Sequence, residues 1–373
     1  MSIFSIVAKP IATITTVFLF AYAPLSGHMI EGSSHYDKED ASHFSVQDIK
    51  ERLNNISSII DINYTPEVGR RIKEYTVNYR VSGQKILGRV DLFFPIFEKN
   101  LQEKNLPDDL KYVAVVESNL EPMAMSKSGA SGLWQFIKST GKMQGLEINN
   151  YIDERRDPEK STVAALDYLA YLYKSFDDWT LALAAYNCGP GNVRKAIRRS
   201  GGSKDYWVIR KHLPKETQKY VPRIIAAMYL MKYYHEHNLQ PTLPNTDLIN
   251  TMKINDGKGH SFKKLADVLD VDYKMLRYLN PMYKTKSFPK NDGHHTLIIP
   301  SSRKMMYWSM YDKDTYRSII AKKEKIQEEK ERQEELVARA LLRPQLSRSE
   351  YIDPIVYLKL VSIRDRYSVN IAL

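Results

Sequence analysis

The chain has 373 residues, enough for one substantial folded core together with a smaller module and tails. It carries 55 Lys and Arg against 44 Asp and Glu, a formal net charge of +11. Such a basic protein favours polyanionic partners: nucleic acid, an anionic membrane or an acidic wall polymer. No zinc-finger, helix-turn-helix or RNA-recognition signature accompanies the charge, so we expect no nucleic-acid partner. The single cysteine, Cys188, excludes an intrachain disulfide.

The first residues have the pattern of an export signal. Lys9 precedes an uncharged run, IATITTVFLFAYA, which ends in an Ala-x-Ala cleavage pattern and is too short for a comfortable membrane span. We predict a signal peptide within residues 1–27, cut after Ala23 or after Gly27. Because Pro24 disfavours the first cut, an uncleaved membrane anchor is the alternative. Both interpretations predict export beyond the inner membrane.

Residues 28–82 begin with a polar segment and continue as short amphipathic helices, one of which starts at Pro66. A longer helix is predicted over Gly83–Asn105. Its apolar stripe consists of Leu87, Val90, Phe94 and Phe97. Pro95 is expected to kink this helix or to split it in two, because proline lacks the amide donor that a helix interior needs.

The stretch Leu106–Gly141 organises the rest of the chain. Pro107 opens a helix whose apolar run ends on Glu117. A carboxyl group directly after a buried face is poorly solvated and holds its proton more tightly. Such a group can act as an acid near neutral pH, which is what protonating a sugar leaving group requires. A lone glutamate in this place is more often a cap or a surface residue, so Glu117 by itself decides nothing.

The helical pattern breaks after Glu117, at Pro122, Gly129 and Gly132. A second helix is then predicted to carry Trp134, Gln135 and Phe136. The small residues would let the backbone approach Glu117. The two aromatic rings would either offer a flat surface to a sugar or pack in the core.

Four short motifs follow one another in the chain. They are Glu117-Ser118, GASGLWQF at 129–136, AAYNCGPGNV at 184–193 and ETQKYV at 216–221. The set resembles the family 1 lytic transglycosylases, whose soluble transglycosylase-like fold is related to goose-type lysozyme. Within that family the chain looks most like the membrane-bound transglycosylase D type. The resemblance covers about residues 83–237.

The resemblance implies a mainly α, lysozyme-like (goose-type) catalytic domain over residues 83–240. It also implies cleavage of the β-1,4 bond between N-acetylmuramic acid and N-acetylglucosamine in peptidoglycan, in the periplasm or cell envelope. Glu117 would act first as the acid and then as the base that closes a 1,6-anhydro ring. Matching motif positions gives the expected substrate-binding residues Ser118, Ser126, Gln135, Tyr186, Asn187 and Tyr220. Without the resemblance, Asn187 would be a turn cap and Tyr220 a core tyrosine.

No cofactor and no metal are expected. His235 and His237 lie two residues apart, hence on different faces of a helix, and no third ligand accompanies them. Helices are predicted from Asp157-Pro158 to Phe176, from Trp179 to Tyr186 and from Asn192 to Arg199. A further helix begins at Pro214 and Glu216 and carries Tyr220.

A proline-containing linker at residues 240–246 precedes a second module, at residues 250–300. Its order of helix, helix and strand resembles a degenerate LysM glycan-binding module, without the usual Gly-Asp-Thr-Leu entry. Glycan binding and simple packing are therefore both open. Residues 301–373 form a tail in which Thr315–Leu342 predicts a solvated, charged helix.

Two rival functions stay open. A hydrolytic goose-type muramidase would need a second carboxylate to activate water, and Glu121, Asp153 and Asp157 are the nearest candidates in the sequence. A non-catalytic wall-binding or scaffold protein would act through the LysM-like segment. The complete motif set around Glu117 argues against this second alternative.

Overall fold

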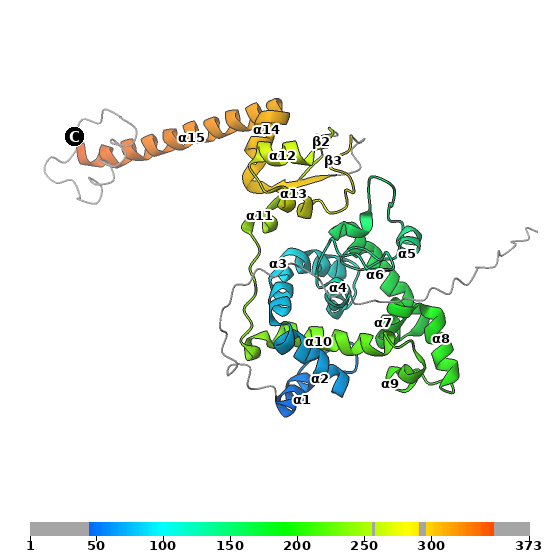
Figure 1. Ribbon diagram of the computed structural model, residues 1–373. Coiled ribbons are helices and arrows are strands. Elements are labelled where there is room, and N and C mark those ends of the chain that lie inside the picture. Colours follow the sequence, from blue (N-terminus) through cyan, green and yellow to red (C-terminus); the bar gives the residue numbers. More distant parts are fainter. Residues whose placement is uncertain (1–44, 256–257, 291–295, 347–373) are drawn as a thin grey trace, which may run out of the picture. The chain divides into compact units, whose positions relative to one another are not determined.

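The computed structural model describes residues 45–255, 258–290 and 296–346. The predicted signal peptide and residues 351–373 lie outside the described residues. The chain divides into two compact units, residues 1–302 and 303–373, and each is described by itself (Figure 1).

The first unit begins with the helices that lead to the central stretch. They are α1 (Val46–Asn54), α2 (Pro66–Lys73), a π-helical segment (Glu74–Asn78) and α3 (Arg80–Glu103). Each of the first two starts with a side-chain cap: the hydroxyl of Ser45 accepts from the amide of Asp48, and that of Thr65 from the amide of Val68. These caps confirm the predicted short amphipathic helices.

Helix α3 is continuous through Pro95, so the prediction that this proline splits it is wrong. One side of the helix is held by buried aromatic packing: the rings of Phe94 and Phe97 are 6.0 Å apart, and Phe97 lies 5.1 Å from Trp134. This packing compensates for the backbone hydrogen bond that proline cannot make.

Helices form the body of the first unit around the central stretch. They are α4 (Tyr112–Ser118), α5 (Lys138–Met143), α6 (Pro158–Phe176), α7 (Trp179–Cys188), α8 (Pro190–Arg199), α9 (Tyr206–Ile209) and α10 (Tyr220–Tyr233). Helix α6 packs on α3 and α7, and α10 packs on α2, α4 and α7 (Figure 1). Helix α10 starts at Tyr220, after a 3-10 turn at Thr217–Lys219, rather than at Pro214 as predicted.

The predicted second helix around Trp134 is also absent. Residues 131–136 form a tight turn, and α5 begins only at Lys138. Gln135 has a φ of 49° and Gly132 a φ of 86°, and neither value fits a right-handed helix. The amide of Ser131 instead donates to the carbonyl of Phe136 at 3.0 Å, which closes the turn.

A small α+β module completes the first unit. Its elements are α11 (Thr246–Ile249), β1 (Thr251–Ile254), β2 (His260–Ser261), α12 (Phe262–Leu269), α13 (Tyr273–Leu279), β3 (Ser287–Phe288) and β4 (Leu297–Pro300). Strands β1 and β4 pair antiparallel, and so do β2 and β3. The predicted order of helix, helix and strand is confirmed. Strand β1 was not foreseen.

The second unit contains α14 (Lys304–Tyr311) and the long α15 (Lys313–Leu346), whose charged face is exposed as predicted. Among the helices within the described ranges, none is both long enough and apolar enough to span a bilayer.

Candidate active site

Helix α4 places Glu117 at the edge of the core. Val113, Ala114 and Val115 are completely buried, and Glu117 follows them in the last turn of the helix. The helix ends at Asn119, whose φ of 53° turns the chain away. The apolar run therefore anchors the helix and leaves the carboxyl group at its end, as the sequence predicted.

The carboxyl group of Glu117 meets the start of α10. The hydroxyl of Tyr220 donates to Oε1 of Glu117 at 2.6 Å, across 103 positions of sequence. Burial raises the pKa of Glu117 from 4.5 to about 7, and it outweighs the hydrogen bond from Tyr220 and the charge of Arg223, which both lower this pKa. Glu117 can therefore hold or release a proton near neutral pH.

The loop of residues 124–136, which we call the site loop, packs beside Glu117. The hydroxyl of Ser118 donates to the carbonyl of Leu133 at 2.9 Å, and the hydroxyl of Tyr186 donates to the carbonyl of Trp134 at 2.8 Å. Tyr186 is buried, close enough to Glu117 for the carboxylate to raise the tyrosine's pKa further after burial has raised it. Two of the predicted substrate-binding residues thus hold the site loop.

The other predicted residues of the site also have internal partners. Gln135 is buried, and its side-chain amide donates to the carbonyl of Gly132 at 2.8 Å. Asn187 is buried and accepts a hydrogen bond from the hydroxyl of Thr217 at 2.8 Å. Ser126 is half-buried and shares a 2.9 Å hydrogen bond with Ser128. Their contact with substrate stays a prediction.

Trp134 and Phe136 belong to the core. Trp134 is completely buried, and its indole N–H donates to the hydroxyl of Thr162 at 2.9 Å; Phe136 is 3% exposed. Of the two alternatives expected for these rings, packing in the core is therefore confirmed, and a flat surface for a sugar is not. Cys188 is also buried, which raises the pKa of its thiol to about 11 and leaves it an unreactive packing residue.

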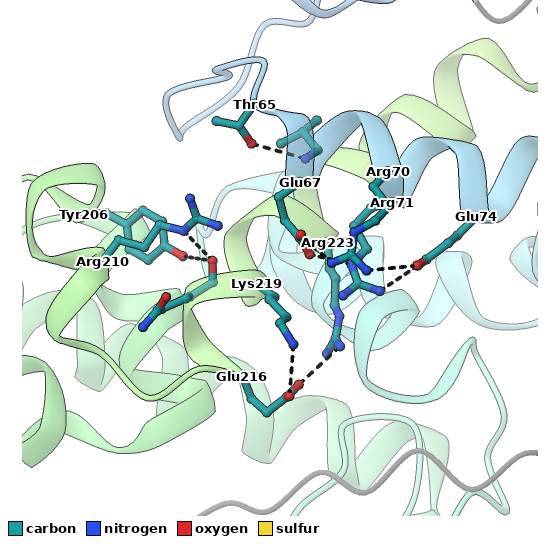
Figure 2. Close-up of polar contacts among 12 residues, drawn as sticks. Thr65, Glu67, Arg70, Arg71, Glu74, Tyr206, Arg210, Glu216, Lys219 and Arg223 are labelled. Atoms are coloured by element: carbon teal, nitrogen blue, oxygen red, sulfur yellow. Dashed lines mark hydrogen bonds and ion pairs between the residues drawn. The ribbon is translucent and has the colours of Figure 1, made fainter.

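Arg223 is a site residue that the sequence analysis missed. It lies one turn after Tyr220 on α10, and its guanidinium is 3.3 Å from Glu216, which also lies 3.5 Å from Lys219 (Figure 2). The spacing of three residues from Tyr220 puts both side chains on one face of the helix, a signal that was available. On the neighbouring α2, Arg71 lies between Glu67 and Glu74 (Figure 2).

The three candidates for a second carboxylate all have structural partners. Glu121 is paired with Arg89 at 2.5 Å. Asp153 is buried and paired with Arg155 at 2.7 Å; burial raises its pKa, but the hydrogen bonds and charge of Arg155 bring it below its usual range. Asp157 caps α6 by accepting from two backbone amides.

The described residues contain no group of three His, Cys, Asp or Glu side chains close enough to bind a metal ion. Arg155 is another residue of importance near the site. It joins Asp153 to the site loop by donating to the carbonyls of Gly129 at 2.7 Å and Phe136 at 3.0 Å. No signal in the sequence indicated this role.

Comparison with known families identifies two parts of the chain. Residues 94–209 match the family described as Transglycosylase SLT domain, and residues 250–314 match the Lytic transglycosylase MltD, LysM-like domain. The chain carries an SLT domain followed by an MltD-type LysM-like domain. This confirms the predicted family, the lysozyme-like, mainly α fold and the small LysM-like module.

Curated relatives agree with the assignment. Membrane-bound lytic murein transglycosylase D of Escherichia coli (strain K12) is 34% identical over 203 residues, which are 53% of this chain and 44% of the relative. Soluble lytic murein transglycosylase of the same strain is 30% identical over 146 residues, 37% of this chain and 23% of the relative. The chain spans less than half the length of the curated relatives it matches.

Among solved structures, the chain is similar to the 70 kDa soluble lytic transglycosylase from Escherichia coli. The TM-score is 0.34 at 25% identity, over 47% of this chain and 32% of that one.

Proposed function

We propose that the protein is a peptidoglycan lytic transglycosylase. It cleaves the β-1,4 bond between N-acetylmuramic acid and N-acetylglucosamine without water and leaves a 1,6-anhydromuramoyl end. The observation that carries the proposal is the carboxyl group of Glu117, whose pKa is raised to about 7 by burial and which accepts a hydrogen bond from Tyr220. The SLT family match and the names of the two curated relatives support it.

One carboxyl group with this pKa can serve two steps. In the first step, protonated Glu117 gives its proton to the glycosidic oxygen as the bond to the muramoyl C1 breaks. In the second step, the carboxylate takes the proton of the C6 hydroxyl of the same sugar, and O6 bonds to C1. Tyr220 binds Oε1, so Oε2 is available for the proton. Between the steps, the Tyr220 hydrogen bond and the charge of Arg223 stabilise the carboxylate.

The same arrangement disfavours the hydrolytic alternative. A hydrolase usually needs a second carboxylate across the scissile bond. Glu121 and Asp153 are in ion pairs and Asp157 caps α6, so each already has a structural partner. In this proposal residues 83–240 carry the reaction, and Ser118, Ser126, Gln135, Tyr186, Asn187 and Tyr220 shape the site that holds the glycan.

Product analysis tests the proposal. Purified cell wall is digested, and the released muropeptides are identified by mass spectrometry before and after borohydride treatment. We expect 1,6-anhydro ends, which are lighter by one water than hydrolysis products and do not react with borohydride. Reducible muramic acid ends would show that water attacks.

Glu117→Gln should lower the rate of glycan cleavage by about ten-thousandfold, because one group serves both steps. An active Glu117→Gln protein would contradict the assignment of the site.

The proposal includes a location in the periplasm or cell envelope. It is supported by the predicted export signal of residues 11–23 and by the similarity to the membrane-bound lytic murein transglycosylase D of Escherichia coli. Cell fractionation with N-terminal sequencing tests it: the protein should be in the envelope fraction and, if cleaved, begin after Ala23 or Gly27. A full-length chain in the cytoplasm would contradict it.

A further inference from the structure

The LysM-like module is joined to the SLT domain through main-chain hydrogen bonds. The amide of Asp153 donates to the carbonyl of Met282 at 2.8 Å, and the amide of Lys284 donates to the carbonyl of Tyr151, also at 2.8 Å. Between them Ile152 and Tyr283 form an antiparallel bridge. We call residues 282–284 the docking segment. It forms a short two-stranded ladder with the SLT domain, which fixes the register of the contact.

The docking segment is well anchored in its own module. Tyr283 is completely buried there, and its hydroxyl donates to the carbonyl of Thr296 at 2.7 Å. Arg277 also donates to the carbonyl of Tyr283. Toward the SLT domain, the ammonium group of Lys284 donates to the carbonyl of Asn149 at 2.7 Å. Because buried backbone groups are costly to leave unpaired, the ladder holds both partners in place.

From the ladder, polar contacts lead to the site loop. Asp153, which donates to the docking segment, also forms the buried ion pair with Arg155. Arg155 in turn donates to the carbonyl of Gly129, which precedes the turn of residues 131–136, and to that of Phe136, at the end of this turn. The backbone approaches so closely that a Cβ on Gly132 would lie 1.7 Å from the carbonyl oxygen of Arg155. The site loop therefore rests directly on residues 153–155.

A second contact of the module lies near the turn that follows Glu117. Tyr278 on α13 packs against the core of the SLT domain, next to the Arg89–Glu121 ion pair. Arg89 also donates to the carbonyl of Asn119 at 3.0 Å, so it holds the turn that follows Glu117. The module thus contacts the supports of both segments that flank the catalytic carboxyl group.

We propose that the LysM-like module is a positioning element of the SLT domain, and that Asp153 and Arg155 connect its docking segment to the site loop beside Glu117. The kinetic consequences of this inference rest on the proposed function. Its structural consequences rest only on the contacts described above. It gives the module a role other than glycan capture: it holds the site loop in place beside the carboxyl group.

The decisive variant is Lys284→Pro. Proline lacks the amide that donates to Tyr151, and the extended backbone of Tyr283 suits the residue before a proline. Lys284→Ala is the matched control, because it loses the ammonium group but keeps the amide. On short soluble glycan fragments, we expect Lys284→Pro to lower kcat about tenfold to a hundredfold with little change in KM, and Lys284→Ala to stay near the wild-type rate. A glycan-capture role would instead raise KM on insoluble wall and leave kcat on fragments unchanged.

The pH profile separates positioning from a general loss of stability. Glu117 faces Tyr220 and Arg223 from α10 and Tyr186 from α7, and these neighbours are unchanged in Lys284→Pro. A loosened site loop would admit water to the carboxyl group and lower its pKa from about 7. The alkaline limb of kcat against pH should therefore move to lower pH. Partial unfolding would reduce the rate without moving this limb.

Hydrogen exchange gives a readout that does not depend on activity. In the full-length Lys284→Pro protein, amides of residues 126–136 should exchange faster, whereas those of α8, α12 and α13 should keep their protection. Loss of protection in α12 and α13, or an unchanged site loop, would overturn the proposal.

Arg155→Lys provides an independent test. It keeps the charge beside Asp153 but replaces the fork of three nitrogens that binds Asp153, Gly129 and Phe136 with one. It should lower kcat and shift the pH profile as Lys284→Pro does. The double variant should have about the same kcat as either single variant, because both break the same connection between the docking segment and the site loop. Multiplied effects would show two separate roles. If the wild-type protein is inactive, the proposed function fails, and the exchange result still decides this inference.

Discussion

Glu117 binds its proton more tightly in the folded chain than in the unfolded chain, and this has a consequence for stability. Burial raises its pKa from 4.5 to about 7, so between these pH values the folded state holds a proton that the unfolded state has released. Stability supplied by this group is present below pH 4.5 and is lost as the pH rises through 7. At higher pH the unfavourable effect is at most about 3 kcal/mol.

Glu117→Gln should therefore be more stable than the wild-type protein at pH 8, by up to about 3 kcal/mol, and equally stable at pH 4. The amide oxygen can still accept from Tyr220, so the pocket keeps its hydrogen bond. Urea unfolding at pH 4, 6 and 8 measures the difference. A gap that does not grow with pH would show that the carboxyl group is not desolvated as described.

The hydroxyl of Tyr220 lowers the pKa of Glu117, whereas burial raises it. Its hydrogen bond lowers the pKa of Glu117, so Tyr220→Phe should raise this pKa above 7. The alkaline limb of the pH–rate profile should move up by about one to two pH units, because a hydrogen bond to a charged group contributes about 1.5–3 kcal/mol. Tyr229→Phe is the control: Tyr229 is also buried on α10, but its hydroxyl bonds to Arg52 and His237. Its profile should match that of the wild-type protein.

At the scale of single residues, the sequence analysis predicted both Glu117 and Tyr220 as site residues, but hydrophobic periodicity alone did not identify them. The apolar run placed Glu117 at the end of a buried face, and that physical argument anticipated its raised pKa. The contact with Tyr220 came from the family resemblance, since nothing local connects residues 103 positions apart. Arg155 could not be foreseen, because its role depends on carbonyl groups of a turn that the sequence analysis took for a helix.

That turn depends on Gly132. The residue has a φ of 86°, which costs other residues about 1–2 kcal/mol, and a Cβ there would clash with the carbonyl of Arg155. Gly132→Ala should therefore destabilise the protein by about 2–5 kcal/mol, the conformational cost plus overpacking. Denaturant unfolding measures the loss.

Gly129→Ala separates the two costs. Gly129 lies in the same loop with a φ of 80°, but no atom lies within 4 Å of the position of a Cβ. It should lose only about 1–2 kcal/mol. Equal losses in the two variants would mean that the close approach to Arg155 does not matter.

Elements were predictable where local signals agree with packing. Helix α6 begins at Pro158 after the Asp157 cap and ends at Phe176, as the sequence predicted, because cap, proline and apolar stripe all indicate the same boundaries. The turn at residues 131–136 was missed because Leu, Trp, Gln and Phe are compatible with a helix, and only tertiary contacts select the left-handed conformation of Gln135. Helix α3 was predicted to kink or split at Pro95; it does not split, because aromatic packing keeps it continuous, and the kink stays a prediction.

At the scale of the whole molecule, composition and motif order predicted the sequence of parts. They could not predict that the LysM-like module contacts the supports of the site, because that contact is made by backbone groups of residues 151–153 and 282–284. A main-chain ladder leaves almost no trace in side-chain patterns. The choice between glycan binding and packing was left open because the usual Gly-Asp-Thr-Leu entry is missing from the module.

Removing helix α15 and removing the LysM-like module should therefore have different effects on stability and activity. A chain shortened after Asp314 retains the LysM-like match and loses the exposed helix α15. The surface ion pairs of that helix contribute little to stability, so the midpoint of thermal unfolding should change by less than about 2–4 °C and kcat on glycan fragments should not change.

A chain shortened after Gln240 loses the whole LysM-like module. The amide of Thr242 no longer donates to Gln84 of α3, and the docking segment and Tyr278 are gone. This chain should unfold at lower temperature and show the acid-shifted pH profile of Lys284→Pro. If it instead keeps the wild-type profile and fails only on insoluble wall, the module serves to capture glycan and does not position the site.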